Sequence, residues 1–220
     1  MRPFDDATRR NIAALCASFV RAAPLDPAVD SAPDSAPDSA PGLKRAAVAI
    51  ALTGSGEGAE TAFLLTRRAS SLRAHRAQWA LPGGRCDAGE TPLQASLREL
   101  QEELGLALTN DSVLGVLDDY PTRSGYLITP VVVWARDAQA IVPNPDEVAS
   151  VHQVVLGSIE SDAAFDFVSI PESTRQVIRF HYEGRLIHAP TAAMIYQFRE
   201  LLAGRQTRVA ELEQPVFAWK

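Results

Sequence analysis

The chain contains 220 residues, of which 46% are hydrophobic and 22% are charged, and its formal net charge at pH 7 is −6. This length and composition suit one sizeable globular domain, or one domain with a short appendage. The negative charge argues against a nucleic-acid backbone or an anionic membrane as the main partner. It allows a polyanionic small substrate, because a bound divalent metal reverses the sign of a site locally. No apolar run approaches the roughly 18 to 20 residues that span a bilayer, so we expect a cytoplasmic protein.

Residues 1–23 have the pattern of an amphipathic helix. Their apolar side chains recur at helical spacing, at Ile12, Leu15, Phe19 and Val20. We expect a helix over about residues 5–22 that docks on the domain, with Cys16 as a small apolar residue on its surface. Residues 24–42 contain the tetrapeptide SAPD twice. Such a composition buries almost no apolar surface, so we expect a flexible linker there.

Residues 43–220 carry the alternating strand and helix signals of one domain. Residues 46–53 and 61–68 are apolar runs of strand length joined by a Gly-rich turn, which predicts a β-hairpin. A short strand is predicted over residues 79–84. Further strand-like segments lie at 113–120, 126–135 and 148–156.

Two helices are predicted in this domain, over residues 92–104 and 190–203. Pro92 suits the first turn of a helix, and Gly105 and Gly204 follow as stop signals. Because strands and helices are mixed rather than strictly alternating, we expect an α+β domain, layered as an α/β/α sandwich.

The predicted helix over residues 92–104 concentrates negative charge. Glu99, Glu102 and Glu103 fall at i, i+3 and i+4 and share one face. Like charges at this spacing disfavour an isolated helix by roughly 0.2–0.5 kcal/mol, and Mg²⁺ or Mn²⁺ would compensate because both prefer hard oxygen ligands. The alternative is an acidic face in contact with solvent. Glu147 could add a carboxylate from a loop, although we expect it to be an ordinary surface residue.

The spacing around this helix favours the metal site. Five residues separate Gly84 from Glu90, seven separate Glu90 from Arg98, and residues 98–106 then read RELQEELGL. This segment resembles the Nudix box, G-x5-E-x7-R-E-U-x-E-E-x-G-U with U an aliphatic residue, at every defined position. The order of the flanking strands is similar to that of Nudix hydrolases through roughly residues 45–160.

The resemblance implies a Nudix fold with a mixed sheet and a loop-helix, and a metal-dependent hydrolase of a nucleoside diphosphate linked to another moiety. The implied cofactor is Mg²⁺ or Mn²⁺. The implied metal-binding residues are Glu99, Glu103, Glu102 and Gly84, and the implied catalytic residues are Glu102, Arg98 and Glu90. In this interpretation Glu99 and Glu103 are the principal ligands, and Glu102 is a further ligand or the base.

The remaining box residues have supporting roles in this interpretation. Arg98 orients the carboxylates of the helix, and Glu90 pairs with Arg98. Gly84 lets backbone carbonyl groups turn toward the metal. The identity of the general base varies within the family, so the resemblance does not assign it.

A second resemblance concerns the substrate. Residues 64–84 read LLTRRASSLRAHRAQWALPGG, similar to the extra motif L-L-T-x-R-x-x-x-L-R-x-H-x-G-Q-V-x-F-P-G-G of the coenzyme A diphosphatase branch. Ala77, Trp79 and Leu81 depart from that motif. The implied substrate-binding residues are Arg67, Arg68, Arg73, His75 and Gln78. Arginine suits the recognition of phosphate, which coenzyme A carries at its 3′ position beside its pyrophosphate; the alternative is a basic loop that faces solvent.

The implied reaction is hydrolysis of coenzyme A or a derivative to adenosine 3′,5′-bisphosphate and 4′-phosphopantetheine. If the helix over residues 190–203 packs over the substrate opening, it would help to hold the pantetheine arm. One alternative is a diphosphatase for ADP-ribose or a related nucleotide, since Pro121 lies near the position of a proline in that branch. Another is a Nudix-like binding module, although such modules typically lose box carboxylates. The acylation state of the substrate, the physiological metal and the formation of a homodimer stay open.

Overall fold

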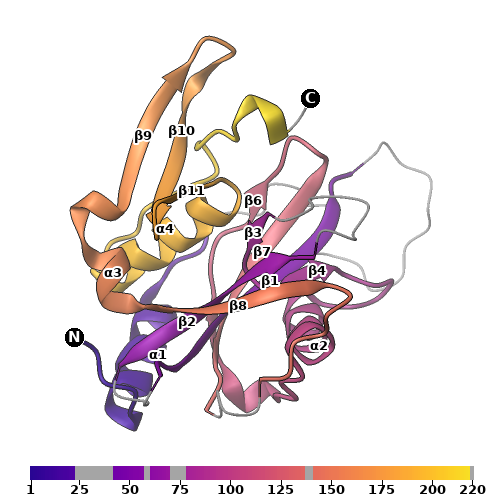
Figure 1. Ribbon diagram of the computed structural model, residues 1–220, viewed down its shortest axis with the longest axis vertical. Coiled ribbons are helices and arrows are strands. Elements are labelled where there is room, and N and C mark those ends of the chain that lie inside the picture. Colours follow the sequence, from indigo (N-terminus) through magenta and orange to yellow (C-terminus); the bar gives the residue numbers. More distant parts are fainter. Residues whose placement is uncertain (23–41, 57–59, 70–77, 137–140, 219–220) are drawn as a thin grey trace.

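The computed structural model describes residues 1–22, 42–56, 60–69, 78–136 and 141–218 (Figure 1). The linker expected over residues 24–42 lies outside these ranges apart from Gly42. Arg73 and His75 lie outside them as well. No helix among the described residues is long and apolar enough to cross a membrane.

Among the described residues, eight strands form one mixed sheet. They are β1 (Lys44–Gly54), β2 (Thr61–Arg68), β3 (Trp79–Ala80), β4 (Gly83–Arg85), β5 (Val113–Val116), β6 (Tyr120–Pro121), β7 (Tyr126–Trp134) and β8 (Val148–Val155). The main path runs β3-β2-β1-β7-β5, with β8 on β2, β4 on β1 and β6 on β7. β1 and β7 are parallel, and the other pairs are antiparallel. The predicted hairpin is confirmed as β1 and β2.

A second, antiparallel sheet of three strands lies beside the first. It consists of β9 (Phe165–Ile170), β10 (Ser173–Tyr182) and β11 (Arg185–His188), in the order β11-β10-β9. The hairpin of β9 and β10 projects from the body of the molecule in Figure 1. These three strands were not predicted from the sequence.

The helices cover both faces of the main sheet. They are α1 (Asp6–Ser18), α2 (Pro92–Leu104), α3 (Leu156–Glu160) and α4 (Thr191–Leu202), with short 3₁₀ turns at Asn110–Ser112, Asp162–Ala164 and Val216–Ala218. Helix α2 matches its predicted bounds, because Thr91 forms a capping box with Gln94 and Gly105 ends the helix at a φ of 71°. The strand predicted over residues 79–84 is instead two strands, β3 and β4, that pair with different neighbours.

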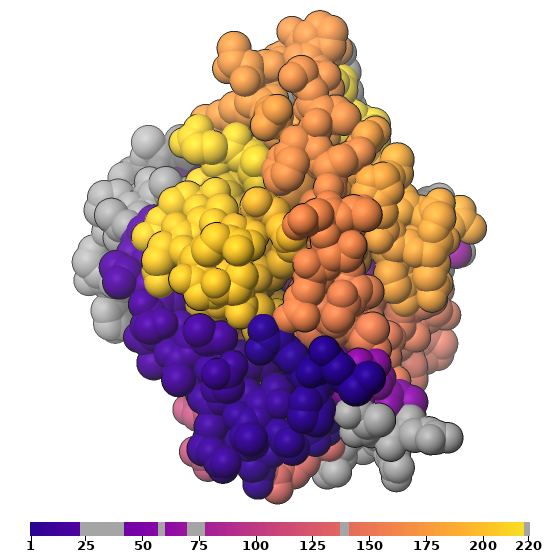
Figure 2. Space-filling view, turned by 90° about the vertical axis from the view of Figure 1, so that its left-hand side faces the viewer, coloured from indigo at the N-terminus to yellow at the C-terminus, as the bar shows by residue number. Residues whose placement is uncertain are grey.

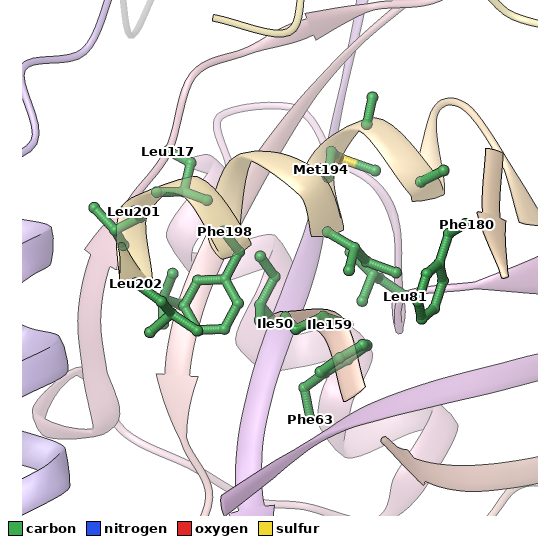
Figure 3. Packing of buried hydrophobic residues seen from close by; sticks show 14 of the residues in the cluster. Ile50, Phe63, Leu81, Leu117, Ile159, Phe180, Met194, Phe198, Leu201 and Leu202 are labelled. Carbon is green, nitrogen blue, oxygen red and sulfur yellow. The ribbon is translucent and has the colours of Figure 1, made fainter. Parts of the chain in front are cut away.

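Side chains on alternate residues of β1 and β7 pack in opposite directions, which creates two cores. Ala49, Ala51, Val131 and Val133 contact α2 through Leu100 and Leu104. Ile50, Leu52, Val132 and Trp134 belong to the larger cluster with α1 and α4. Figure 3 shows Phe198, Leu201 and Met194 of α4 among the labelled side chains of this cluster, with the Phe198 ring on the side of Ile50. The expected α/β/α sandwich is therefore confirmed.

The N-terminal helix docks on the domain as expected. Ile12, Cys16 and Phe19 are buried in the larger core. After the helix, the Val20 N–H donates to Gln206 Oε1 at 3.0 Å, and Arg208 Nη2 donates to the Val20 carbonyl at 2.7 Å. Figure 2 shows the indigo N-terminal residues against the yellow C-terminal residues on one face of the molecule.

Candidate active site

Helix α2 is fixed so that two of its carboxylates approach strand β4. Leu100 and Leu104 are fully buried against the sheet, which sets the rotation of the helix about its axis. Glu99 then lies against Gly84, where a Cβ atom would come within 2.2 Å of Glu99 Oε1. Real Cβ contacts are never that short, so only glycine allows the helix carboxylate to occupy this position.

Three carboxylates converge at this point. Glu99, Glu103 and Glu147 each offer an oxygen, and these oxygens lie within 4.8 Å of one another. We call these three residues the carboxylate cluster. Glu103 is 2% exposed, and its Oε2 accepts a hydrogen bond from the Gly83 N–H at 3.2 Å.

Glu147 is a member of the cluster and not the ordinary surface residue that the sequence led us to expect. Its loop is fastened to the end of α2, where the Asn144 N–H donates to the Glu103 carbonyl at 2.9 Å. Helix ends leave such carbonyls without partners inside the helix. The Asn144 carbonyl also accepts from the Glu147 N–H at 3.1 Å, which places the Glu147 side chain beside the helix.

The cluster is poorly compensated in the absence of a cation. Burial raises the pKa of Glu103 to about 8, and repulsion from Glu99 adds to the effect, while Arg68 and the Gly83 N–H oppose it. Burial also raises the pKa of Glu99. A buried group of hard oxygen ligands with unbalanced charge fits a divalent cation such as Mg²⁺ or Mn²⁺. The residues present therefore suit the metal that the sequence implies.

Arg98 joins the box residues into one network. Its Nε and Nη2 donate to Glu90 at 2.9 and 3.0 Å, and its Nη1 donates to Glu99 Oε1 at 3.0 Å. Because of the hydrogen bonds to Glu90, the pKa of that carboxyl is lowered. Arg98 Nη2 also donates to the Arg85 carbonyl at 2.9 Å, which ties α2 to β4.

Glu102 occupies a different environment from Glu99 and Glu103. Its side chain is 52% exposed and accepts from Arg98 Nη1 at 2.8 Å. It lies outside the carboxylate cluster found among the described residues. Helical spacing alone placed these three glutamates on one face, but the packing of α2 on the sheet buries Glu103 and leaves Glu102 near solvent.

A cavity of about 610 Å³ lies next to β4, whose three residues all line it. Its floor consists of Ala46, Val48, Tyr126 and Ile128 from β1 and β7. Its walls come from β11, the start of α4 and the C-terminal segment, which we define as residues 212–218. Gly83 and Gly84 line the cavity too, so the same two residues border both the cavity and the carboxylate cluster.

The predicted substrate-binding residues are only partly brought together. Arg68 and Gln78 line the cavity, and Arg68 Nη1 lies 3.5 Å from Glu103 Oε1. Arg67 is exposed on β2 and is absent from the described lining. The structure adds Arg85 and residues of the C-terminal segment, which the sequence did not single out. The pair Asp146–Glu147 in the loop sequence PNPDEV was the only local signal for Glu147.

Comparisons with known proteins agree with this geometry. A family model described as the NUDIX domain matches residues 43–172. The chain is 34% identical over 141 residues to the protein named uncharacterized Nudix hydrolase NudL from Photorhabdus laumondii, covering 63% of this chain and 75% of that protein. It is 33% identical over 146 residues to the NudL of Pectobacterium atrosepticum, covering 65% and 76%.

One solved structure extends the comparison to the fold. The MutT/nudix family protein from Enterococcus faecalis superposes with a TM-score of 0.53 at 17% identity, covering 81% of this chain and 69% of that chain. At that identity the likeness concerns the fold alone. The matched domain and the NudL relatives place this chain in the Nudix hydrolase family, whose pyrophosphohydrolases generally use divalent metals and act on small nucleotide-linked substrates.

Proposed function

We propose that this protein is a metal-dependent diphosphatase that cleaves coenzyme A or a derivative into adenosine 3′,5′-bisphosphate and 4′-phosphopantetheine. In this reaction the oxygen of one water bonds to one phosphorus of the pyrophosphate and the P–O bond from that phosphorus to the bridging oxygen breaks. Each product keeps one of the two phosphates of the pyrophosphate, and the adenosine product also keeps its 3′-phosphate. The observation that carries the proposal is the position of Gly83 and Gly84, which border both the carboxylate cluster and the cavity. A diphosphate at this border would leave room for a long substituent in the cavity.

The carboxylate cluster is the proposed cation site. Glu99, Glu103 and Glu147 would hold Mg²⁺ or Mn²⁺, and a bound cation of this kind activates water and neutralises charge on phosphoryl oxygens. Arg98 positions Glu99 by a direct hydrogen bond and is itself fixed by Glu90. We assign Glu102 to proton transfer rather than to cation binding, because its side chain is 52% exposed and lies outside the cluster.

Arg68 is the proposed contact for the diphosphate. It lines the cavity beside Glu103, and its buried Nε has no hydrogen-bond partner among the residues that the structure describes. Buried donors without a partner are rare and costly, and an anionic phosphate oxygen would satisfy this one. Gln78 lines the same cavity. The predicted contacts of Arg67, Arg73 and His75 with the 3′-phosphate belong to this proposal as well.

A substrate panel tests the proposal. Purified protein with Mg²⁺ or Mn²⁺ is assayed with coenzyme A, ADP-ribose, NADH and dinucleoside polyphosphates, and products are identified by mass spectrometry. We expect the highest kcat/KM for coenzyme A or an acylated form. A higher value for ADP-ribose would reject the coenzyme A assignment, and turnover without added metal in the presence of a chelator would reject the cation site.

Variants of α2 provide the matched control. Glu103→Gln should lower kcat by at least about 100-fold, as losses at metal sites commonly do, while Gln101→Glu changes an exposed neighbour and should leave kcat nearly unchanged.

Light scattering on the same preparation distinguishes a monomer from a homodimer.

A further inference from the structure

The C-terminal segment is held in a fixed position over the cavity. Glu213 is 2% exposed and accepts hydrogen bonds from Arg123 Nε at 3.0 Å and from Ser173 Oγ at 2.8 Å. Its backbone N–H donates to the Gln176 carbonyl at 2.8 Å. Tyr120 also donates from its hydroxyl to the Leu212 carbonyl at 2.8 Å. The segment is thereby tied to both sheets at Leu212 and Glu213, and Gln214, Pro215 and Phe217 after it line the cavity.

The lining of the cavity includes apolar side chains that the described residues leave exposed. Six large apolar residues are exposed within the described part of the chain, and two of them, Leu186 and Phe217, line the cavity. Phe217 is 66% exposed and makes an edge contact with the His188 ring, with centroids 5.3 Å apart. Single exposed apolar residues are common, but an apolar pair that lines one cavity suits an apolar group of a ligand.

Two arginines of the described lining carry positive charge, and they belong to β2 and β4. Arg68 Nη1 lies 3.5 Å from Glu103 Oε1, whereas the Arg85 guanidinium lies over the Tyr126 ring, 5.2 Å from its centroid. The other polar side chains of the described lining are hydroxyls, amides and aromatic ring nitrogens, on Gln78, Trp79, Thr122, Ser124, Tyr126, His188, Thr191 and Gln214. Burial lowers the pKa of His188 below its usual 6.5, so this ring is uncharged at neutral pH.

The two arms of coenzyme A differ in charge. The adenosine arm carries a 3′-phosphate, which needs cationic contacts. The pantetheine arm is uncharged and combines two amides with geminal methyl groups. A largely apolar cavity with several hydroxyl and amide groups, whose described lining carries cations on Arg68 and Arg85, matches the pantetheine arm beside a diphosphate.

We infer that the cavity holds the pantetheine arm of the substrate and that Phe217 and Leu186, at its mouth, determine the preference for that arm. This inference rests on the proposed function. It also places the adenosine arm outside the cavity, on the other side of the diphosphate.

Binding of the two expected products tests the inference. Affinities for 4′-phosphopantetheine and for adenosine 3′,5′-bisphosphate are measured by calorimetry with Mg²⁺ present, for the unchanged protein and for Phe217→Ala. We expect the variant to bind 4′-phosphopantetheine about tenfold more weakly, the effect of losing one partly buried aromatic contact. Its affinity for adenosine 3′,5′-bisphosphate should change less than about twofold.

Phe167→Ala is the matched control, because it makes the same substitution at a half-exposed phenylalanine that is absent from the described lining. It should leave both affinities unchanged. Leu186→Asp is the second test variant and should weaken 4′-phosphopantetheine binding more than Phe217→Ala, because it places a carboxylate at the mouth.

Three results would overturn the inference. The first is an equal loss of affinity for both products in Phe217→Ala. The second is an unchanged affinity of that variant for 4′-phosphopantetheine. The third is that the unchanged protein does not bind 4′-phosphopantetheine. Coenzyme A hydrolysis by the unchanged protein separates these failures from failure of the proposed function. If the unchanged protein hydrolyses coenzyme A and any of the three results is found, the proposed function stands. Only the placement of the pantetheine arm in the cavity is then refuted.

Discussion

Replacing Glu213 by glutamine removes the charge that ties the C-terminal segment to both sheets. The Arg123 guanidinium, the Ser173 hydroxyl and the Gln214 N–H hold the pKa of Glu213 at about 2, compared with its usual 4.5. Hydrogen bonds to a charged group contribute about 1.5–3 kcal/mol each at most. Since a glutamine side chain would keep the shape but lose the charge, we expect Glu213→Gln to lower the free energy of unfolding by roughly 2–3 kcal/mol at pH 7.

The unfolding free energy that Glu213→Gln loses should be smaller at acidic pH than at pH 7. A carboxyl whose folded pKa is depressed stabilises the protein above its unfolded pKa, and this stability disappears as pH falls from about 4.5 to about 2. At pH 3.5 the unfolded chain has taken up most of a proton at this position and the folded protein almost none. Linkage then removes about 1.4 kcal/mol of the contribution of Glu213 between pH 7 and pH 3.5.

Urea denaturation at pH 7 and pH 3.5 measures this difference. The gap in unfolding free energy between the unchanged protein and Glu213→Gln should shrink by about 1.4 kcal/mol at the lower pH. Glu211→Gln, two residues earlier and 81% exposed, should show no gap at either pH. A gap for Glu213→Gln that is equal at both pH values would refute the claim that ionic hydrogen bonds hold the segment.

Three further variants probe the active site. Glu147→Gln should weaken Mn²⁺ binding about 10- to 100-fold, as measured by electron paramagnetic resonance. Asp146→Asn, a substitution at its exposed neighbour, is the control. Equal Mn²⁺ affinities in the two variants would contradict the membership of Glu147 in the cluster. Gly84→Ala places a Cβ 2.2 Å from Glu99 Oε1, so the carboxylate must move; we expect lower Mn²⁺ affinity with an unchanged melting temperature, and normal affinity would count against the close approach. Arg68→Gln should raise KM for coenzyme A about tenfold with a smaller change in kcat, and an unchanged KM would remove Arg68 from the substrate contacts.

The elements that the sequence predicted well are those with strong local signals. Helix α2 has a capping threonine, an early proline and a terminal glycine at its own ends. The strands β9, β10 and β11 lacked such signals. Along β10, exposed residues 174–176 precede the buried pair Val177 and Ile178, so apolar and polar residues do not alternate. Helix α4 and the C-terminal segment pack against that sheet, and these long-range contacts leave no local signal in the sequence.

The carboxylate cluster shows the same division between local and long-range information. The spacing of the box was sufficient to select Glu99 and Glu103. Glu147 joins them only because Asn144 binds the end of α2 at Glu103, a contact between segments far apart in the sequence. Glu102 follows helical periodicity equally well, but its exposure depends on how α2 rotates against the sheet, which periodicity does not specify.

The hydrogen bonds of Val20 join residues separated by 186 and 188 positions. During synthesis, the apolar face of α1 can pack on β5 once that strand has emerged. Gln206 and Arg208, which bind Val20, are synthesised much later. Contacts this distant slow folding, because a large loop must close before they form. Until then Phe19 lacks Arg208, which lies over its ring in the finished protein, and transiently exposed apolar surface of this kind favours aggregation.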